Sequence, residues 1–170
     1  MRSAAVYFFS VLVFACAFSL SSLVGAASAT KERFPPKVCN NRTRGPDLEK
    51  QQQAALADFA HLYVDLQDVQ TAFDRWVPGE YIQHNPNAAQ GRDAAIAILT
   101  AGFADPQVTS TNKTVFAGQG FGAVHFKLSL NPQTVFAVVD YFRFQGNCIV
   151  EHWDVLQQIF GNETNPIAFF

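Results

Sequence analysis

The hydrophobic positions between residues 47 and 104 recur every three or four residues, as on the buried face of amphipathic helices. The pattern predicts three helices, the first starting at Asp47 and the third at Asp93, both favoured N-cap residues. Pro78-Gly79 ends the second helix, and a polar connection follows over residues 80–92. The apolar positions of the first two helices are Ala55, Leu56, Phe59, Leu62, Tyr63, Leu66, Val69, Phe73 and Trp76.

After Pro106 the period of the pattern changes from 3.6 to 2, which indicates strands. Short turn sequences separate the predicted strands, and strands joined in this way form an antiparallel meander. Three helices followed by such strands predict an α+β fold, with the helices packed on one face of a curved sheet. The predicted strands cover residues 115–117, 123–130, 135–144 and 149–157.

Alternation along the last two strands places ionisable residues on apolar faces. Asp140 shares its face with phenylalanines and valine, and Asp154 shares its face with Val150 and His152. If this face is the covered one, its carboxylates lose water and can exchange a proton near neutral pH. The solvent-facing alternative, or a pairing of Asp140 with Arg143, stays open because the opposite face also carries apolar residues.

The first 29 residues have the pattern of a secretory signal peptide. Arg2 precedes a long apolar run, and Ala27-Ser28-Ala29 gives a small-residue cleavage site before Thr30. An uncleaved membrane anchor is the alternative, since the run is nearly long enough to span a bilayer. We expect cleavage near Ala29-Thr30, secretion, and no membrane segment in the mature chain.

The remaining cysteines and the sequons agree with secretion. Cys39 and Cys148 are an even pair in an oxidising route, so we expect a disulfide, with two free thiols as the alternative. Asn41, Asn112 and Asn162 each begin an N-x-T sequon and are expected to be glycosylated in surface loops.

Charge and motifs exclude several classes of function. A net charge of −2 gives no basic surface for nucleic acid. Phosphate-binding loops and the G-x-S-x-G motif are missing, so we expect no nucleotide cofactor and no serine nucleophile. His152 and Asp154 supply half of a two-His-one-carboxylate metal site, which only His84 or His125 could complete. We therefore expect no metal.

Two segments resemble the SnoaL-like family, the polyketide-cyclase branch of the nuclear transport factor 2-like superfamily. They are YIQHNPNAAQGRDA (81–94) and DYFRFQGNCIVEHWDVLQ (140–157), in the family's order and spacing. The resemblance implies an α+β cone, in which a curved antiparallel sheet and three N-terminal helices enclose a pocket. The implied organisation is a signal peptide (1–29), an extended arm (30–46), a SnoaL-like domain (47–158) and a C-terminal tail (159–170).

In the cyclases of this family, a carboxylate at the position of Asp154 removes a proton alpha to a carbonyl group, without a metal or cofactor. The resemblance therefore implies an inward-facing Asp154 as the catalytic base, tuned by Asp140 and His152. The position of Asp140 is often a histidine in those cyclases, which leaves the substrate open. The candidates for substrate binding in the two matching segments are Tyr81, His84, Asn85, Trp153 and Arg143.

Two classes of function follow from this resemblance. The first is a secreted, cofactor-free acid/base enzyme of aldol cyclase, isomerase, dehydratase or hydrolase type, acting on an apolar carbonyl compound. The second is a non-catalytic protein, which either binds a small apolar ligand in the same pocket or acts through its surface. Members of this superfamily commonly pair through the outer face of the sheet, so a homodimer is expected in either class.

Overall fold

The computed structural model describes residues 38–170 of the chain. The predicted signal peptide (1–29) and the first part of the predicted arm (30–37) lie outside the described residues. Within residues 38–170, none of the helices combines the length and the apolar character that crossing a bilayer requires.

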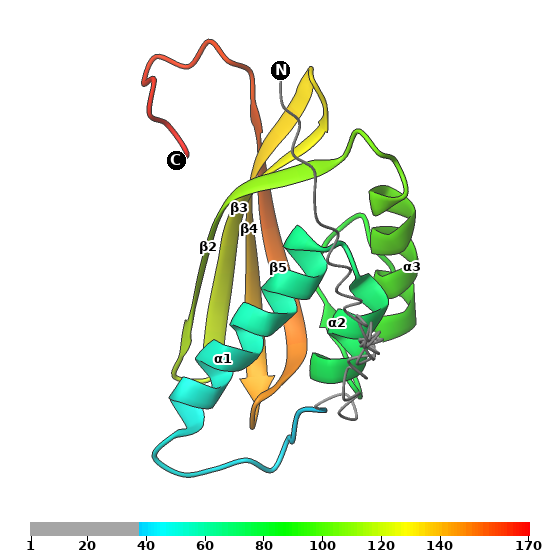
Figure 1. Ribbon diagram of the computed structural model, residues 1–170, viewed down its shortest axis with the longest axis vertical. Coiled ribbons are helices and arrows are strands. Elements are labelled where there is room, and N and C mark those ends of the chain that lie inside the picture. The colour runs from blue at the N-terminus through cyan, green and yellow to red at the C-terminus, as the bar shows by residue number, and fades with distance from the viewer. Residues whose placement is uncertain (1–37) are drawn as a thin grey trace, which may run out of the picture. The chain divides into compact units, whose positions relative to one another are not determined.

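The fold is a curved sheet covered by helices on one face (Figure 1). The strand order is β1-β5-β4-β3-β2, and every neighbouring pair is antiparallel except β1 and β5. This arrangement confirms the predicted α+β cone. The elements are α1 (Leu48–Ala60), the π-helical segment η1 (His61–Asp65), α2 (Val69–Trp76), β1 (Ile82–Gln83), α3 (Arg92–Phe103), β2 (Thr109–Gly118), β3 (Phe121–Asn131), β4 (Thr134–Gln145) and β5 (Cys148–Ile159).

The sheet differs from the predicted meander at both edges. Strand β1 lies within the connection predicted for residues 80–92 and pairs in parallel with β5, which makes the sheet mixed. Two residues are too few to show a period, so alternation could not reveal this strand. Strand β2 begins at Thr109, six residues before the predicted start, because the added segment is polar and lacks an apolar face.

The helix starts also differ in detail from the prediction. Asp47 occupies the N-cap of α1, but its side chain makes no capping hydrogen bond. Gly91 is the N-cap of α3, and Asp93 lies in the first turn, where its charge favours the positive end of the helix dipole. Asp68 caps α2 by accepting a hydrogen bond from the backbone N–H of Thr71 at 3.1 Å.

An aromatic cluster forms the core between the helices and the sheet. Phe59 of α1 is 1% exposed, and its ring centroid lies 5.4–5.6 Å from those of Tyr63, Phe73 and Phe142. The edge-to-face and tilted geometries suit the aromatic quadrupoles. The cluster thus connects α1, η1, α2 and β4, and all four rings line the cavity described below.

The N-terminal arm is attached to the β4–β5 turn. The predicted disulfide between Cys39 and Cys148 is present. The backbone N–H of Asn40 donates to Oδ1 of Asn147 at 2.7 Å, and Gly146 passes close to the arm with a φ of 59°. A Cβ atom at Gly146 would lie 2.3 Å from the carbonyl oxygen of Asn40, so the close approach requires glycine.

The C-terminal tail follows directly after β5, which ends at Ile159, one residue beyond the predicted domain boundary. The tail returns to the sheet, where the ring of Phe170 stacks on His125 with centroids 4.7 Å apart. His125 pairs with Val139 on the outer face of the sheet, away from the helices.

Candidate functional site

A cavity of about 120 Å³ lies between the helices and the inner face of the sheet. Most of its wall is apolar, and its polar side chains converge from β1, β4, β5 and η1. Such a mostly apolar pocket with a few convergent polar groups is the usual form of a small-molecule site. The polar side chains in the wall are Tyr63, Tyr81, Gln83, Asn85, Asp140, His152 and Asp154.

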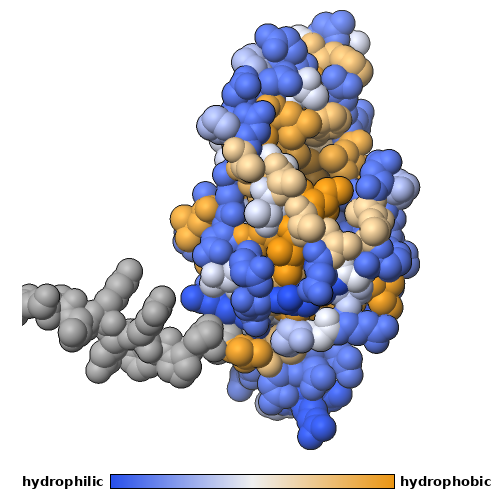
Figure 2. All heavy atoms as spheres, turned by 90° about the vertical axis from the view of Figure 1, so that its right-hand side faces the viewer, coloured by the Kyte–Doolittle hydropathy of each residue, from blue (hydrophilic) through white to orange (hydrophobic). Residues whose placement is uncertain are grey.

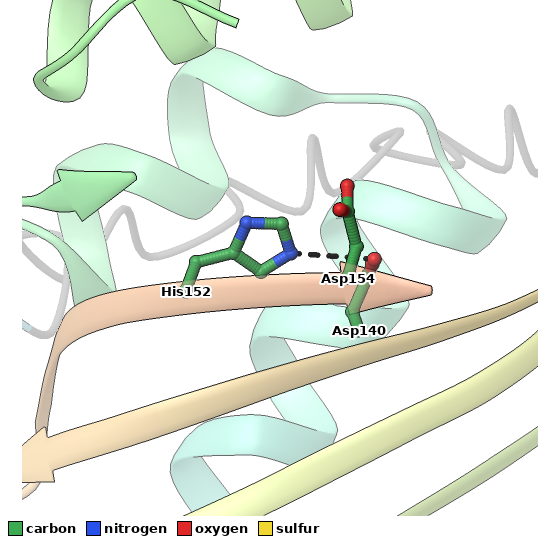
Figure 3. Close-up of side chains that lie close together, drawn as sticks. All are labelled: Asp140, His152 and Asp154. Atoms are coloured by element: carbon green, nitrogen blue, oxygen red, sulfur yellow. Dashed lines mark ion pairs between the residues drawn. The ribbon is translucent and has the colours of Figure 1, made fainter. Parts of the chain in front are cut away.

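The two aspartates of the cavity lie side by side on neighbouring strands. Asp140 of β4 is the direct cross-strand partner of Asp154 of β5, and Phe142 is the partner of His152. Partners of this kind project from the same face of a sheet, so both carboxylates and the imidazole point to the same side (Figure 3). The sequence alternation thus placed Asp140, His152 and Asp154 on one face, and the structure shows that this face is inward.

Val150, which the sequence alternation places on the same face as His152 and Asp154, does not lie on the inner face of the sheet. Glu151 pairs with Arg143, and Ile149 pairs with Phe144, so Val150 has no partner in β4 and forms a β-bulge. Ile149, at 1% exposure, therefore takes the inward position that strict alternation assigned to Val150. A bulge adds one residue without changing the sequence pattern around it, which explains why alternation missed it.

The histidine of the site has a defined tautomer. Nδ1 of His152 lies 2.9 Å from Oε1 of Gln83, which also accepts a hydrogen bond from the backbone N–H of Asn85. This second contact identifies the atom as the amide oxygen, so Nδ1 of His152 carries a hydrogen and donates it. Nε2 then faces Oδ1 of Asp140 at 3.3 Å.

The two carboxylates have different surroundings. Asp140 is 3% exposed, and its Oδ2 has no hydrogen-bond partner among the described residues. Asp154 is half-buried at the cavity, where its Oδ2 accepts a hydrogen bond from the side-chain amide of Asn85. The imidazole of His152 thus contacts the deeper carboxylate, that of Asp140. The carboxylate of Asp154 uses one oxygen for Asn85, and its other oxygen can contact a ligand.

Two tyrosines add hydrogen-bond donors to the wall. Burial raises the pKa of Tyr63 well above its ordinary value, and the negative charge of Asp140 raises it further. Burial and the charges of Asp140 and Asp154 likewise raise the pKa of Tyr81. Both phenols stay protonated at physiological pH, so they can donate to an oxygen of a ligand.

Tyr63 and Gln83 were not among the candidates from the sequence. Tyr63 has the spacing of a core residue in a regular helix, but it lies in η1, a π-helical segment that its spacing does not reveal. Segments of this type are frequent at functional sites. Gln83 lies in the two-residue β1, where no pattern marks it.

Three of the predicted substrate-binding residues lie on the opposite, outer face of the sheet. His84 stacks on Trp153 with ring centroids 4.6 Å apart, and His84 and Arg143 both contact the carboxylate of Glu151. The hydrogen bond from His84, followed by that from Arg143, lowers the pKa of Glu151. Because neighbours in a strand point to opposite faces, these side chains lie outside the cavity. There His84 connects the end of β1 to β5, and Arg143 connects β4 to β5.

The cluster also has the composition of a cation site. Ligand atoms of Asp140, His152 and Asp154 all lie within 4.8 Å of one another, so this group could hold a metal ion. From the sequence, only His84 or His125 could supply the missing ligand. Both lie on the outer face, and a second carboxylate takes the third position.

Comparisons with known proteins identify the fold. No family model matches the sequence, and no curated protein matches it. A nuclear transport factor 2-like protein of unknown function from Mesorhizobium loti matches the structure with a TM-score of 0.57 and 17% identity, covering 68% of this chain and 98% of that one. A provisionally assigned ketosteroid isomerase from Kribbella flavida matches with a TM-score of 0.53 and 12% identity, covering 72% and 89%.

A third similar structure is a provisionally assigned hydroxylase from Streptomyces galilaeus, with a TM-score of 0.52, 16% identity and coverage of 64% and 90%. At these identities the likeness concerns the fold. The chain has the nuclear transport factor 2-like fold, which confirms the architecture implied by its resemblance to the SnoaL-like family.

Proposed function

We propose that this protein is a secreted enzyme that performs cofactor-independent acid/base chemistry on an apolar carbonyl compound. The observation that carries the proposal is the half-buried carboxylate of Asp154 in an apolar cavity, oriented by Asn85 and backed by the buried pair of Asp140 and His152. A positioned carboxylate with restricted access to water suits general base catalysis. The fold alone does not decide the reaction, so the proposal rests on the site.

The proposed reaction begins with removal of a proton alpha to the carbonyl group. The carboxylate of Asp154 accepts the proton, the C–H electron pair moves into the carbonyl group, and an enolate forms. The phenol of Tyr63 or Tyr81 donates a hydrogen bond to the enolate oxygen, which stabilises the charge where it develops. The enolate carbon then takes the proton back from Asp154, as in an isomerase. Alternatively it attacks a second carbonyl carbon, whose π electron pair moves to its oxygen, and that oxygen takes the proton from Asp154, as in an aldol cyclase.

Exchange of alpha protons for deuterium tests the first step without knowledge of the natural substrate. We would follow a 2-alkanone, a cyclic enone and a 1,3-diketone by proton NMR in deuterated buffer, with and without EDTA. Wild-type protein is expected to accelerate exchange equally in both buffers, and Asp154→Asn is expected to abolish it. Asp93→Asn, a change at a side chain that is 96% exposed, is the matched control.

The outcomes separate the two classes of function. Exchange that survives Asp154→Asn contradicts the assignment of the base, and exchange that EDTA removes indicates that the cluster uses a metal. If these compounds bind without exchange in any variant, the enzyme proposal fails and a ligand carrier is supported instead.

Secretion is part of the proposal and has separate support. The disulfide between Cys39 and Cys148 suits an oxidising compartment. The sequon asparagines Asn41, Asn112 and Asn162 are exposed, as glycosylation requires. The expectation of a surface loop is wrong for Asn112, which lies in strand β2 at the irregularity between Thr111 and Thr114. Expression in a eukaryotic secretory host, followed by N-terminal sequencing and glycosidase treatment of the medium, is expected to show an N-terminus at Thr30 and a loss of mass.

We also propose a homodimer formed through the outer face of the sheet. Phe116, Tyr141 and Val155 expose apolar surface there. Sedimentation of the unglycosylated protein is expected to show a dimer that Val155→Glu converts to a monomer. A wild-type monomer at all concentrations would contradict this part of the proposal, as would a Val155→Glu dimer.

A further inference from the structure

A second cavity, of about 110 Å³, lies beside the candidate site and has no role in the proposed reaction. Its wall comes from α3 and β3 and from Val108, and contains apolar side chains together with Gly102 and Tyr63. None of the lining residues carries a charge. The second cavity therefore suits a hydrocarbon group, whereas the first offers two carboxylates and an imidazole.

The two cavities share a wall. Tyr63, Ile98 and Leu99 line both of them, so they are adjacent and differ in polarity. The face of the molecule toward α3 shows a run of apolar atoms bordered by hydrophilic ones (Figure 2). Ile98 and Leu130, which are 48% and 37% exposed, leave the second cavity open to solvent at its edge. Ile98 lines both cavities and is exposed, so an elongated ligand that lies along this residue would contact both of them.

We propose that the ligand is an elongated amphipathic compound, with its carbonyl group at Asp154 and an unbranched apolar chain in the second cavity. The position of the carbonyl end rests on the proposed function. The position of the ligand's apolar chain rests on the second cavity alone. The lining of that cavity carries no charge, and some of its residues also line the first cavity. A compact polar carbonyl compound would leave this apolar surface in contact with water and gain nothing from it.

Gly102 gives a specific way to fill the second cavity. It lies in α3, and a Cβ atom placed there would meet no other atom within 4 Å. A Cβ atom therefore has room at this position, and the rest of a leucine side chain can extend over the cavity that Gly102 lines. Replacing a helical glycine by leucine also favours the helix, so the variant is expected to fold. Ala97→Leu adds the same side chain at an exposed position of α3 that lines neither cavity.

The experiment measures the affinity of the folded mature protein for the series from 2-pentanone to 2-undecanone by calorimetry. We expect affinity to increase about fourfold with each added methylene until the chain fills the second cavity, and then to level off. Gly102→Leu is expected to remove the gain for the long members and to keep the affinity for the short ones. Ala97→Leu is expected to behave as the wild type.

Three results would overturn the proposal. These are affinity independent of chain length, absence of binding by every member of the series, and equal behaviour of Gly102→Leu and Ala97→Leu. Sedimentation of both variants adds a fourth, since a change of oligomeric state in Gly102→Leu alone would show that a second copy of the chain covers the cavity. Chain-length-dependent binding without proton exchange would retain this inference and reject the enzyme. Proton exchange in which affinity does not depend on chain length would support the enzyme and reject this inference.

Discussion

The disulfide between Cys39 and Cys148 allows a quantitative prediction of stability. The disulfide is removed in two ways, by the double substitution Cys39→Ser/Cys148→Ser and by a reducing agent added to the wild-type protein. Both are compared with the oxidised wild type. The two cysteines are 109 residues apart in sequence, so the disulfide closes a loop that contains most of the described chain. For a loop of this length, the chain-entropy model gives about 4.8 kcal/mol of stabilisation, because the cross-link restricts the unfolded state.

The folded state is expected to change little when the disulfide is removed. The backbone N–H of Cys39 donates to the carbonyl oxygen of Arg75 at 2.8 Å, and Asn40 keeps its hydrogen bond to Asn147. These contacts hold the arm in place without the covalent link. The loss of unfolding free energy therefore arises in the unfolded chain, and we expect about 4–5 kcal/mol.

Urea denaturation followed by tryptophan fluorescence provides the assay, since Trp76 is buried in the core. The double variant and the reduced wild type are expected to show the same lower midpoint and matching spectra before unfolding. A loss below about 2 kcal/mol would refute the entropic reasoning. Matching midpoints with altered native spectra would instead show that the arm detaches and that the folded state carries part of the effect.

Three further predictions concern the site, the turn and the sheet edge. Asp154→Asn is expected to leave the melting temperature unchanged or to raise it, because a carboxylate in an apolar cavity is a cost to stability; a fall of several degrees would indicate a structural role. Gly146→Ala is expected to be more destabilising than Gly120→Ala by about 1–3 kcal/mol in urea denaturation, since both need a positive φ but only a Cβ at Gly146 meets the backbone of the arm. The lowered pKa of Glu151 means that its stabilisation is complete above its ordinary value of 4.5 and is lost as pH falls through the lower folded value. Glu151→Gln is therefore expected to flatten the acid side of the stability curve, and an unchanged curve would show that this carboxylate is not involved.

The sequence predicts those parts of the fold that repeat a pattern over many residues. Strands β3, β4 and β5 begin and end within two residues of the predicted positions, because apolar and polar residues alternate through them. The inward carboxylate of Asp140 was visible as an ionisable residue on an apolar face. Which face was inward came only from the family resemblance, since both faces carry apolar side chains.

The remaining features depend on single residues that carry no periodic signal. Strand β1 is too short to show alternation, and its register against β5 decides that Gln83 points inward and His84 outward. Tyr63 reaches the cavity from a π-helical segment, whose extra residue per turn is not visible in the spacing of apolar positions. The two matching sequence segments therefore group candidates that lie on opposite faces of the sheet, such as Asn85 at the cavity and His84 on the outer face.

The β-bulge at Val150 has a consequence for the whole of β5. Cys148 pairs with Gln145 on one side of the bulge, and His152 pairs with Phe142 on the other. In an unbroken strand Cys148 would have the same parity as His152 and Asp154, and its sulfur would point to the inner face of the sheet. The unpaired Val150 reverses the alternation of inward and outward side chains between the two parts of β5. It keeps the disulfide that anchors the arm off the inner face of the sheet, while His152 and Asp154 of the same strand stay on that face.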